Sequence, residues 1–293
     1  DNTYLYMGTD NGILIYNYRT DRYEQPATDF PTDVRTMALQ GDTLWIGALN
    51  GLYTYQLQNR KLSPLGTKRN GLPHNTIYSI IRTGDNQIYV GTYNGLCRYI
   101  ASNGKFEKIP LPVNSSQSNL FVNSLLEDTG RQCIWIGTEG YLFQYFPSTG
   151  QMKQTEAFHN NSIKSLALDG NGYLLAGTDN GLYVYHNDVT PLQHIIHDSR
   201  NIQSLTNNII WNIFADQEHN IWLGTDYGIS LSRYNSALQF IPISQITGTG
   251  DGNQFYSLFR DSKGFYWFGG TNGLIRFTDP AGDKHNAIWY RMG

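Results

Sequence analysis

Apolar and polar residues alternate in short runs along the whole chain, and one octapeptide marks seven of these runs. The run that ends at Gly47 shows the pattern, because Leu44 and Ile46 would face one side of an extended strand and Trp45 the other. The copies occupy residues 6–13, 45–52, 89–96, 135–142, 175–182, 222–229 and 267–274. Their first glycines lie between 39 residues (Gly8 to Gly47) and 47 residues (Gly177 to Gly224) apart. This period with strand-like content is typical of propeller blades of four strands each.

Each repeat accommodates four strands. The run before the first glycine is the second strand, the run after the turn is the third, and a short outer strand such as 105–109 follows. Five copies contain Asn-Gly, as at Asn94 and Gly95, which indicates a hairpin turn in which both residues tolerate positive φ. An inner strand precedes six of the motifs, with the order apolar, variable, small polar, apolar, as in residues 77–80. We expect the small residue to allow inner strands to converge.

The sequence contains seven second strands but only six inner strands. We therefore expect an all-β fold, a single seven-bladed β-propeller over residues 1–293, with four antiparallel strands per blade. The first strand of blade one would lie outside the chain, either before Asp1 or after Gly293. We expect that the natural protein continues past Gly293, since a strand from the far end would cover an open sheet edge. Residues 286–291 would form the outer strand of the last blade.

Composition narrows the function. The chain of 293 residues is 40% hydrophobic and 14% aromatic, with a net charge of −3 and both signs interspersed. The basic stripe of a nucleic-acid-binding protein is missing, and no apolar run of about 18 residues suggests a membrane span. We expect no nucleic-acid contact, no membrane insertion by this chain and no cofactor. Cys97 and Cys133 sit in apolar runs and are expected to be buried free thiols.

The repeated W-I-G-T-x-N-G-L, with an upstream D-x-x-G-x-x, resembles the two-component-regulator propeller repeat. The upstream part is clearest in residues 216–225 and 261–270, and residues 169–172 also fit. The resemblance implies the periplasmic sensor region of a hybrid two-component system of Bacteroidetes, anchored in the inner membrane. It further implies an oligosaccharide ligand, a second propeller and a β-sandwich C-terminal to this chain, and a homodimeric full-length histidine kinase that regulates polysaccharide-utilisation genes.

The repeated aromatic residues invite a sugar-stacking role, but one copy per blade is what packing between sheets requires. Trp45, Tyr89, Trp135, Trp222 and Trp267 are therefore expected in the core. Function is expected where the repeat is broken on one shared face, around the mouth of a channel. The variable inner-strand position supplies cations, aromatic rings and an amide, a mixture that suits the apolar faces and hydroxyls of a carbohydrate.

The candidate ligand-binding residues are Arg35, His74, Tyr78, Tyr93, Asn123, Glu139, Lys164, Asp179, Trp211, Asp226, Tyr227 and Tyr256. Asp10, Asn50 and Asn75 extend the same turns. We expect no catalytic and no metal-binding residue in this chain, although Glu139, Asp179 and Asp226 could supply paired carboxylates, and His194 and His197 have a spacing compatible with a metal site. Two alternatives stay open: an extracytoplasmic lyase or glycosidase acting on polysaccharide, and a protein-interaction scaffold.

Overall fold

The computed structural model describes residues 3–24, 29–65, 70–112, 120–154, 158, 161–186, 191–234, 240–242, 254–278 and 287–291. The described residues form strands β1 to β27 and no α-helix. The strands make seven separate antiparallel sheets, which confirms the all-β, seven-bladed β-propeller class. By backbone contacts the chain divides into two compact units, Asp1–Glu139 with Phe143–Lys153, and Gly140–Leu142 with Gln154–Gly293. The prediction of a single domain stays a prediction.

The first unit contains three blades and nearly all of a fourth. Strand order in each sheet follows the chain, and the first sheet has three described strands where the others have four. The strands are β1 (Tyr4–Thr9), β2 (Gly12–Asn17), β3 (Arg22–Glu24), β4 (Val34–Gln40), β5 (Thr43–Ala48), β6 (Gly51–Gln56), β7 (Lys61–Leu65), β8 (Ile77–Arg82), β9 (Ile88–Thr92), β10 (Gly95–Ile100), β11 (Lys105–Ile109), β12 (Val122–Asp128), β13 (Cys133–Thr138), β14 (Leu142–Phe146) and β15 (Gln151–Gln154).

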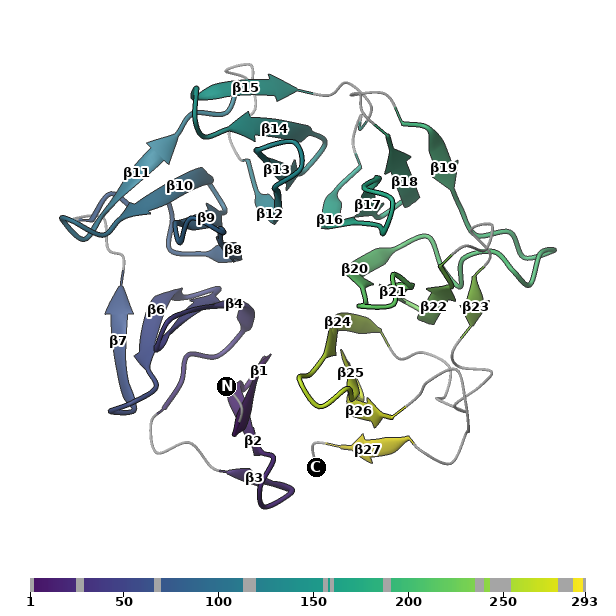
Figure 1. Cartoon of the computed structure of the whole chain (residues 1–293), viewed down its shortest axis with the longest axis horizontal. Coiled ribbons are helices and arrows are strands. Elements are labelled where there is room, and N and C mark those ends of the chain that lie inside the picture. The colour runs from purple at the N-terminus through teal and green to yellow at the C-terminus, as the bar shows by residue number, and fades with distance from the viewer. Residues whose placement is uncertain are drawn as a thin grey trace. The chain divides into compact units, whose positions relative to one another are not determined.

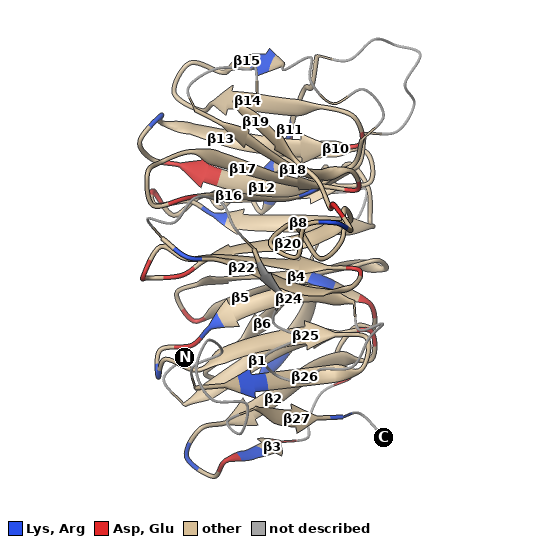
Figure 2. Cartoon of the chain, turned by 90° about the vertical axis from the view of Figure 1, so that its right-hand side faces the viewer, with Lys and Arg blue, Asp and Glu red and all other residues tan. Residues whose placement is uncertain are grey.

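The second unit contains three four-stranded blades. Their strands are β16 (Ile163–Leu168), β17 (Leu174–Thr178), β18 (Gly181–Tyr185), β19 (Gln193–Ile195), β20 (Ile210–Ala215), β21 (Ile221–Thr225), β22 (Gly228–Ser232), β23 (Ile241–Pro242), β24 (Phe255–Arg260), β25 (Tyr266–Gly270), β26 (Gly273–Phe277) and β27 (Ile288–Tyr290). Strand β27 falls within the predicted last outer strand, of which Asn286 lies outside the described residues. Lys and Arg are interspersed with Asp and Glu along the strands and turns (Figure 2).

The two faces of a second strand pack against different neighbours, as the alternation predicted. In β5, Leu44 and Ile46 share a core with Ile13 of β2, whereas Trp45 lies in a core with Ile77 of β8. The repeated aromatic residues are only 2–3% exposed, which confirms their place between sheets: Trp45, Tyr89, Trp135, Trp222 and Trp267. Cys97 and Cys133 are buried free thiols as expected, and burial raises the pKa of both.

The predicted Asn-Gly hairpin connects the second and third strands of a blade. At the turn between β9 and β10 the predicted hairpin forms, and of the two turn residues Gly95 takes positive φ (101°) whereas Asn94 does not. The Thr92 hydroxyl donates to the Gly95 carbonyl (2.9 Å) and accepts from the Asn94 amide (3.1 Å). The motif threonine therefore closes the turn with its side chain, and this explains its place in the repeat.

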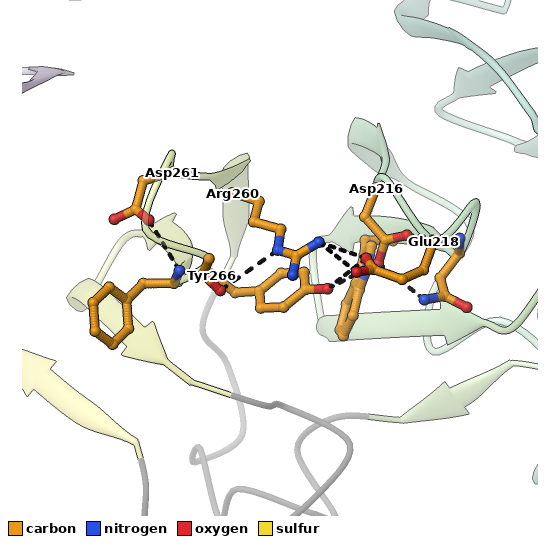
Figure 3. Close-up of polar contacts among 9 residues, drawn as sticks. Asp216, Glu218, Arg260, Asp261 and Tyr266 are labelled. Carbon is orange, nitrogen blue, oxygen red and sulfur yellow. Dashed lines mark hydrogen bonds and ion pairs between the residues drawn. The ribbon is translucent and has the colours of Figure 1, made fainter. Parts of the chain in front are cut away.

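A buried aspartate joins the inner strand to the second strand at the opposite end of the blade. Asp216 is 5% exposed, and its Oδ1 accepts from the Asn220 amide (2.8 Å). Its Oδ2 accepts from the Trp222 indole (2.8 Å) and from the Tyr266 hydroxyl of the next blade (3.0 Å; Figure 3). Burial, reinforced by the Asp216 charge, raises the pKa of Tyr266, so this phenol stays a donor.

The same junction carries an ion pair. Nη1 of Arg260 lies 2.7 and 2.6 Å from the two carboxylate oxygens of Glu218, and the guanidinium lies 5.1 Å from the centre of the Tyr266 ring (Figure 3). Asp261 repeats the aspartate arrangement one blade further on, where it accepts from the Trp267 indole (2.8 Å). The upstream D-x-x-G-x-x of the repeat is therefore a structural element.

Asp128 is the corresponding aspartate of the fourth blade and gives the fold a dependence on pH. Burial alone would raise the pKa of its carboxyl, but hydrogen bonds from Trp135 and Arg131 outweigh burial and hold that pKa below its ordinary value. A carboxyl with a depressed folded pKa stabilises the fold above its unfolded pKa of about 3.9, and this stabilisation is lost as pH falls through the folded value.

We therefore expect the free energy of unfolding to decrease below about pH 5 more steeply in the wild type than in Asp128→Asn. At pH 7 the variant should be the less stable of the two. Urea denaturation followed by tryptophan fluorescence between pH 7 and pH 3 measures both values. Parallel pH profiles for the two proteins would show that the Asp128 charge makes no difference.

Candidate functional site

The six inner strands that the structure describes share one irregularity at their second residue. In each, the pairing with the second strand shifts between the first and third residues and leaves the second unpaired in a β-bulge. The bulged residues are Arg35, Tyr78, Asn123, Lys164, Trp211 and Tyr256. A bulge bends the strand and redirects its side chain, and bulges are frequent beside functional sites. The six variable positions predicted from the sequence are thus the six bulge positions.

The small polar residue after the bulge joins neighbouring inner strands. The Ser79 hydroxyl donates to the Val122 carbonyl of the next inner strand (2.9 Å), and the Ser165 hydroxyl accepts from the Ile213 amide (2.9 Å). A Cβ added at Gly91 would lie 2.1 Å from the Ser79 hydroxyl oxygen, which explains the first glycine of the motif. Small size was therefore only part of the reason for this residue type, because its hydroxyl also connects the blades.

In the second unit, three bulge residues from neighbouring inner strands form a continuous row. The Lys164 ammonium lies 4.4 Å from the centre of the Trp211 ring, and that ring meets the Tyr256 ring edge-on at 5.1 Å and 70°. Both ring contacts are favourable, since a cation is attracted to the face of an indole and tilted aromatic pairs are preferred. Tyr256 is 41% exposed, so the Lys164–Trp211–Tyr256 row offers an accessible aromatic surface beside a positive charge.

Neighbouring turns fix this row. The Trp211 indole donates to Oδ1 of Asp226 (2.5 Å), and the Tyr256 hydroxyl donates to the Gln254 amide oxygen. Asp179 accepts from the backbone amide of Ser162 (3.2 Å) and so holds the entry to β16. Tyr227 is 50% exposed. The structure thus brings Asp226 to the row, whereas within the described part of the chain Asp179 and Tyr227 make no hydrogen bond or ring contact with the row's side chains.

In the first unit, aromatic rings form a second row. His74 lies 4.9 Å from Tyr93, Tyr93 lies 4.2 Å from Phe121, and Phe121 lies 6.0 Å from Tyr78, measured between ring centres. His74 Nδ1 accepts from the Thr76 amide (3.0 Å), which orients the imidazole. The His74–Tyr93–Phe121–Tyr78 row therefore combines three predicted residues with one that the sequence analysis missed.

Polar groups accompany this first row. Nδ2 of Asn123 donates to Oε1 of Glu139 (3.0 Å), and Arg35 is exposed on the neighbouring inner strand. Burial raises the pKa of Tyr78, with Tyr93 and Glu139 adding to the rise and Arg35 opposing it. Arg35, Tyr93 and Glu139 therefore lie close enough to Tyr78 to affect its pKa. That both rows line one channel mouth stays a prediction.

Phe121 directly precedes inner strand β12. Its position before an inner strand is the sequence signal that could have identified it as a candidate. The corresponding residues are Asp33, Thr76, Ser162, Ile209 and Gln254. Their variety resembles that of the bulge position, but only the bulge position was compared between copies. A comparison of the preceding residue would have revealed an aromatic side chain in one blade.

The carboxylates and histidines considered for catalysis or metal binding each have a hydrogen-bond or stacking partner within the chain. Glu139 and Asp226 accept from side chains and Asp179 from a backbone amide, as described above. The His194 ring stacks on Tyr183 (4.0 Å between centres), and His197 Nδ1 lies 2.5 Å from the Leu205 carbonyl oxygen. In the described ranges no three His, Cys, Asp or Glu side chains gather as metal ligands. The same ranges include no helix with the length and apolarity needed to cross a membrane.

Comparison with known proteins gives a consistent picture. Residues 71–94, 204–227 and 249–272 match the family model described as two component regulator propeller. A curated relative, Histidine kinase P4 of Formosa agariphila, is 29% identical over 307 residues and matches 93% of this chain. Two crystal structures from B. thetaiotaomicron match the whole chain at 91% and 92% identity, each with a TM-score of 0.78. The first is described as the extracellular domain of a putative one component system and the second as that of a putative hybrid two component system.

The chain spans only part of these relatives. It covers 21% of the curated kinase and 40% and 39% of the two crystallised chains.

Proposed function

This chain belongs to the two-component regulator propeller family, and from that premise we propose that it is the ligand-sensing, extracytoplasmic part of a hybrid two-component sensor. We further propose that its ligand is an oligosaccharide. The full-length protein would be a histidine kinase anchored in the inner membrane, with this chain in the periplasm. The relatives support the signalling context, since one is named a histidine kinase and two are extracellular domains.

The observation that carries the ligand proposal is the Lys164–Trp211–Tyr256 row. Aromatic rings offer flat apolar surfaces to the faces of a sugar ring, while Lys164, Asp226 and the Tyr256 hydroxyl offer hydrogen bonds to its hydroxyls. The bulges that carry Lys164, Trp211 and Tyr256 each belong to a rigid sheet. These side chains are therefore positioned before a ligand binds, which lowers the entropic cost of binding. In the first unit, His74, Tyr78, Tyr93, Asn123 and Glu139 would form a candidate contact surface of their own, connected by ring contacts and by the Asn123–Glu139 hydrogen bond.

Signalling requires the ligand to bind two arrangements of the receptor with different affinity. The parts that would be rearranged lie outside this chain in the proposal, namely a second propeller and a β-sandwich that lead to the membrane and the kinase of a homodimer. In this scheme the chain performs no chemistry and acts only by binding.

Calorimetric titration of the purified chain against a panel of plant and host oligosaccharides tests the proposal. We expect one class of oligosaccharide to bind with micromolar affinity, and chromatography of the same mixtures to detect no shortened product. Release of product would favour the polysaccharide-degrading enzyme instead. No binding across the panel, by this chain or by the full-length ectodomain, would contradict carbohydrate sensing and favour an interaction scaffold.

A further inference from the structure

The second unit contains a cavity of about 220 Å³ between the sheets β16–β19 and β20–β23, which lie side by side in Figure 1. Leu175, Val184 and Ile221 form its apolar wall, and Tyr173, His219 and Tyr234 contribute aromatic rings. It also touches Asp169, at the end of β16 that is opposite to the bulge residue Lys164. The cavity is therefore separate from the Lys164–Trp211–Tyr256 row.

The next junction of the same unit is filled at the equivalent place. There Asp216 accepts from Trp222 and Tyr266, and Arg260 pairs with Glu218 (Figure 3). Alignment on the aspartates 169, 216 and 261 shows what replaces these side chains at the cavity. Leu175 stands for Trp222, Ile221 for Tyr266, Ala215 for Arg260 and Asn171 for Glu218. Four large or charged groups are thus exchanged for smaller ones. In the opposite direction, Tyr173 stands for Asn220 and His219 for Gly264, and these two rings line the space that remains.

The exchange also removes two hydrogen-bond donors. Oδ1 of Asp169 accepts from the backbone amides of Asn171 (2.9 Å) and Tyr173 (2.8 Å), and Oδ1 of Asp261 accepts in the same way from Lys263 and Phe265. Within the described ranges no group donates to its Oδ2, the oxygen that in Asp216 accepts an indole N–H and a phenol O–H. Asp169 is half-buried, and the cavity lining adds polar groups of Gln193, Ser232 and Arg233 to the apolar wall. A carboxylate oxygen in such a place gains from a hydrogen-bond donor on a ligand.

We propose that this cavity is a binding site for a small planar aromatic molecule that carries one N–H or O–H donor. The ring would occupy the space left by the missing indole, between Leu175, Ile221 and the rings of Tyr173 and Tyr234, and its donor would bind Oδ2 of Asp169. The volume suffices, because a cavity of roughly 150 Å³ accommodates benzene. The chain would then bind a second class of ligand at a site separate from the proposed oligosaccharide site.

The test compares indole with benzofuran, in which an oxygen atom replaces the N–H group, by calorimetry and ligand-observed NMR on the purified chain. We expect indole to bind the wild type and benzofuran to bind at least about tenfold more weakly, the usual effect of losing a hydrogen bond to a charged group. Leu175→Trp should supply both the ring and the donor, abolish indole binding and raise the melting temperature.

Asp169→Asn provides a second variant if Leu175→Trp does not fold. It keeps an oxygen for the two backbone amides but removes the charge, so indole should bind several-fold more weakly while thermal unfolding stays cooperative. Three results would each overturn the proposal: no indole binding to the wild type, equal affinity for indole and benzofuran, or unchanged indole affinity in a folded Leu175→Trp or Asp169→Asn variant.

Discussion

Replacing both Trp211 and Tyr256 by alanine is expected to weaken oligosaccharide binding about 100-fold or more while the chain stays folded. Truncating a well-packed aromatic contact residue commonly costs a complex about 2 kcal/mol or more, and each 1.4 kcal/mol is a factor of ten in affinity. The two rings contact each other at 5.1 Å, so their effects should not add simply. Tyr256 is 41% exposed, so its truncation leaves the core intact.

Calorimetry with the oligosaccharide identified by the panel measures this loss, and thermal unfolding confirms the fold. Phe259→Ala is the matched control, because Phe259 is an exposed aromatic residue (47%) three positions along the same strand. It should bind as the wild type does. Unchanged affinity in the double variant would contradict the assignment to this row, and loss of binding in Tyr78→Ala or Tyr93→Ala instead would place the ligand at the row in the first unit.

The architecture could be predicted because the same strand pattern occurs in seven copies along the chain. Alternation around Trp45 fixed which side chains face which neighbour, and the burial of Leu44, Trp45 and Ile46 agrees with it. The details of the turn could not be predicted in the same way. Gly95 alone takes positive φ, because the Thr92 side chain provides the hydrogen bonds that close the turn, and a dipeptide rule for Asn-Gly ignores that residue.

The site was predictable in position but not in form. Variation among copies pointed to the residues later found at the bulges, yet nothing in a single strand sequence announces that Trp211 and its equivalents are unpaired. Contacts between blades, such as Lys164 over Trp211, depend on how neighbouring strands are placed and so need the structure. The loss of Trp at Leu175 is visible in the repeat, but only the packed neighbours show that the space it leaves is not closed.

Asp216→Ala is expected to lower the free energy of unfolding by about 3–5 kcal/mol, a large fraction of the total for a protein domain. The change leaves the Trp222 indole and the Asn220 backbone amide without their acceptor, and it leaves the Tyr266 hydroxyl with only the longer contact to Oε2 of Glu218 (3.5 Å) in the described ranges. Trp222 and Tyr266 are 2% and 7% exposed, so water cannot replace that acceptor freely, and each unsatisfied donor costs about 1–3 kcal/mol. The melting temperature should fall by about 10 °C.

Asp169→Ala is the matched control, because Asp169 directly follows the equivalent inner strand and, among the residues that the structure describes, accepts from the two backbone amides of its own turn alone. Without an indole or a phenol to leave unsatisfied, it should cost about 1–2 kcal/mol. Urea denaturation of both variants measures the difference. If the two substitutions destabilise the chain equally, the side-chain donors contribute nothing beyond the turn itself. In that case the contrast between the filled and the open junction would no longer explain why a donor-bearing ring should bind beside Asp169.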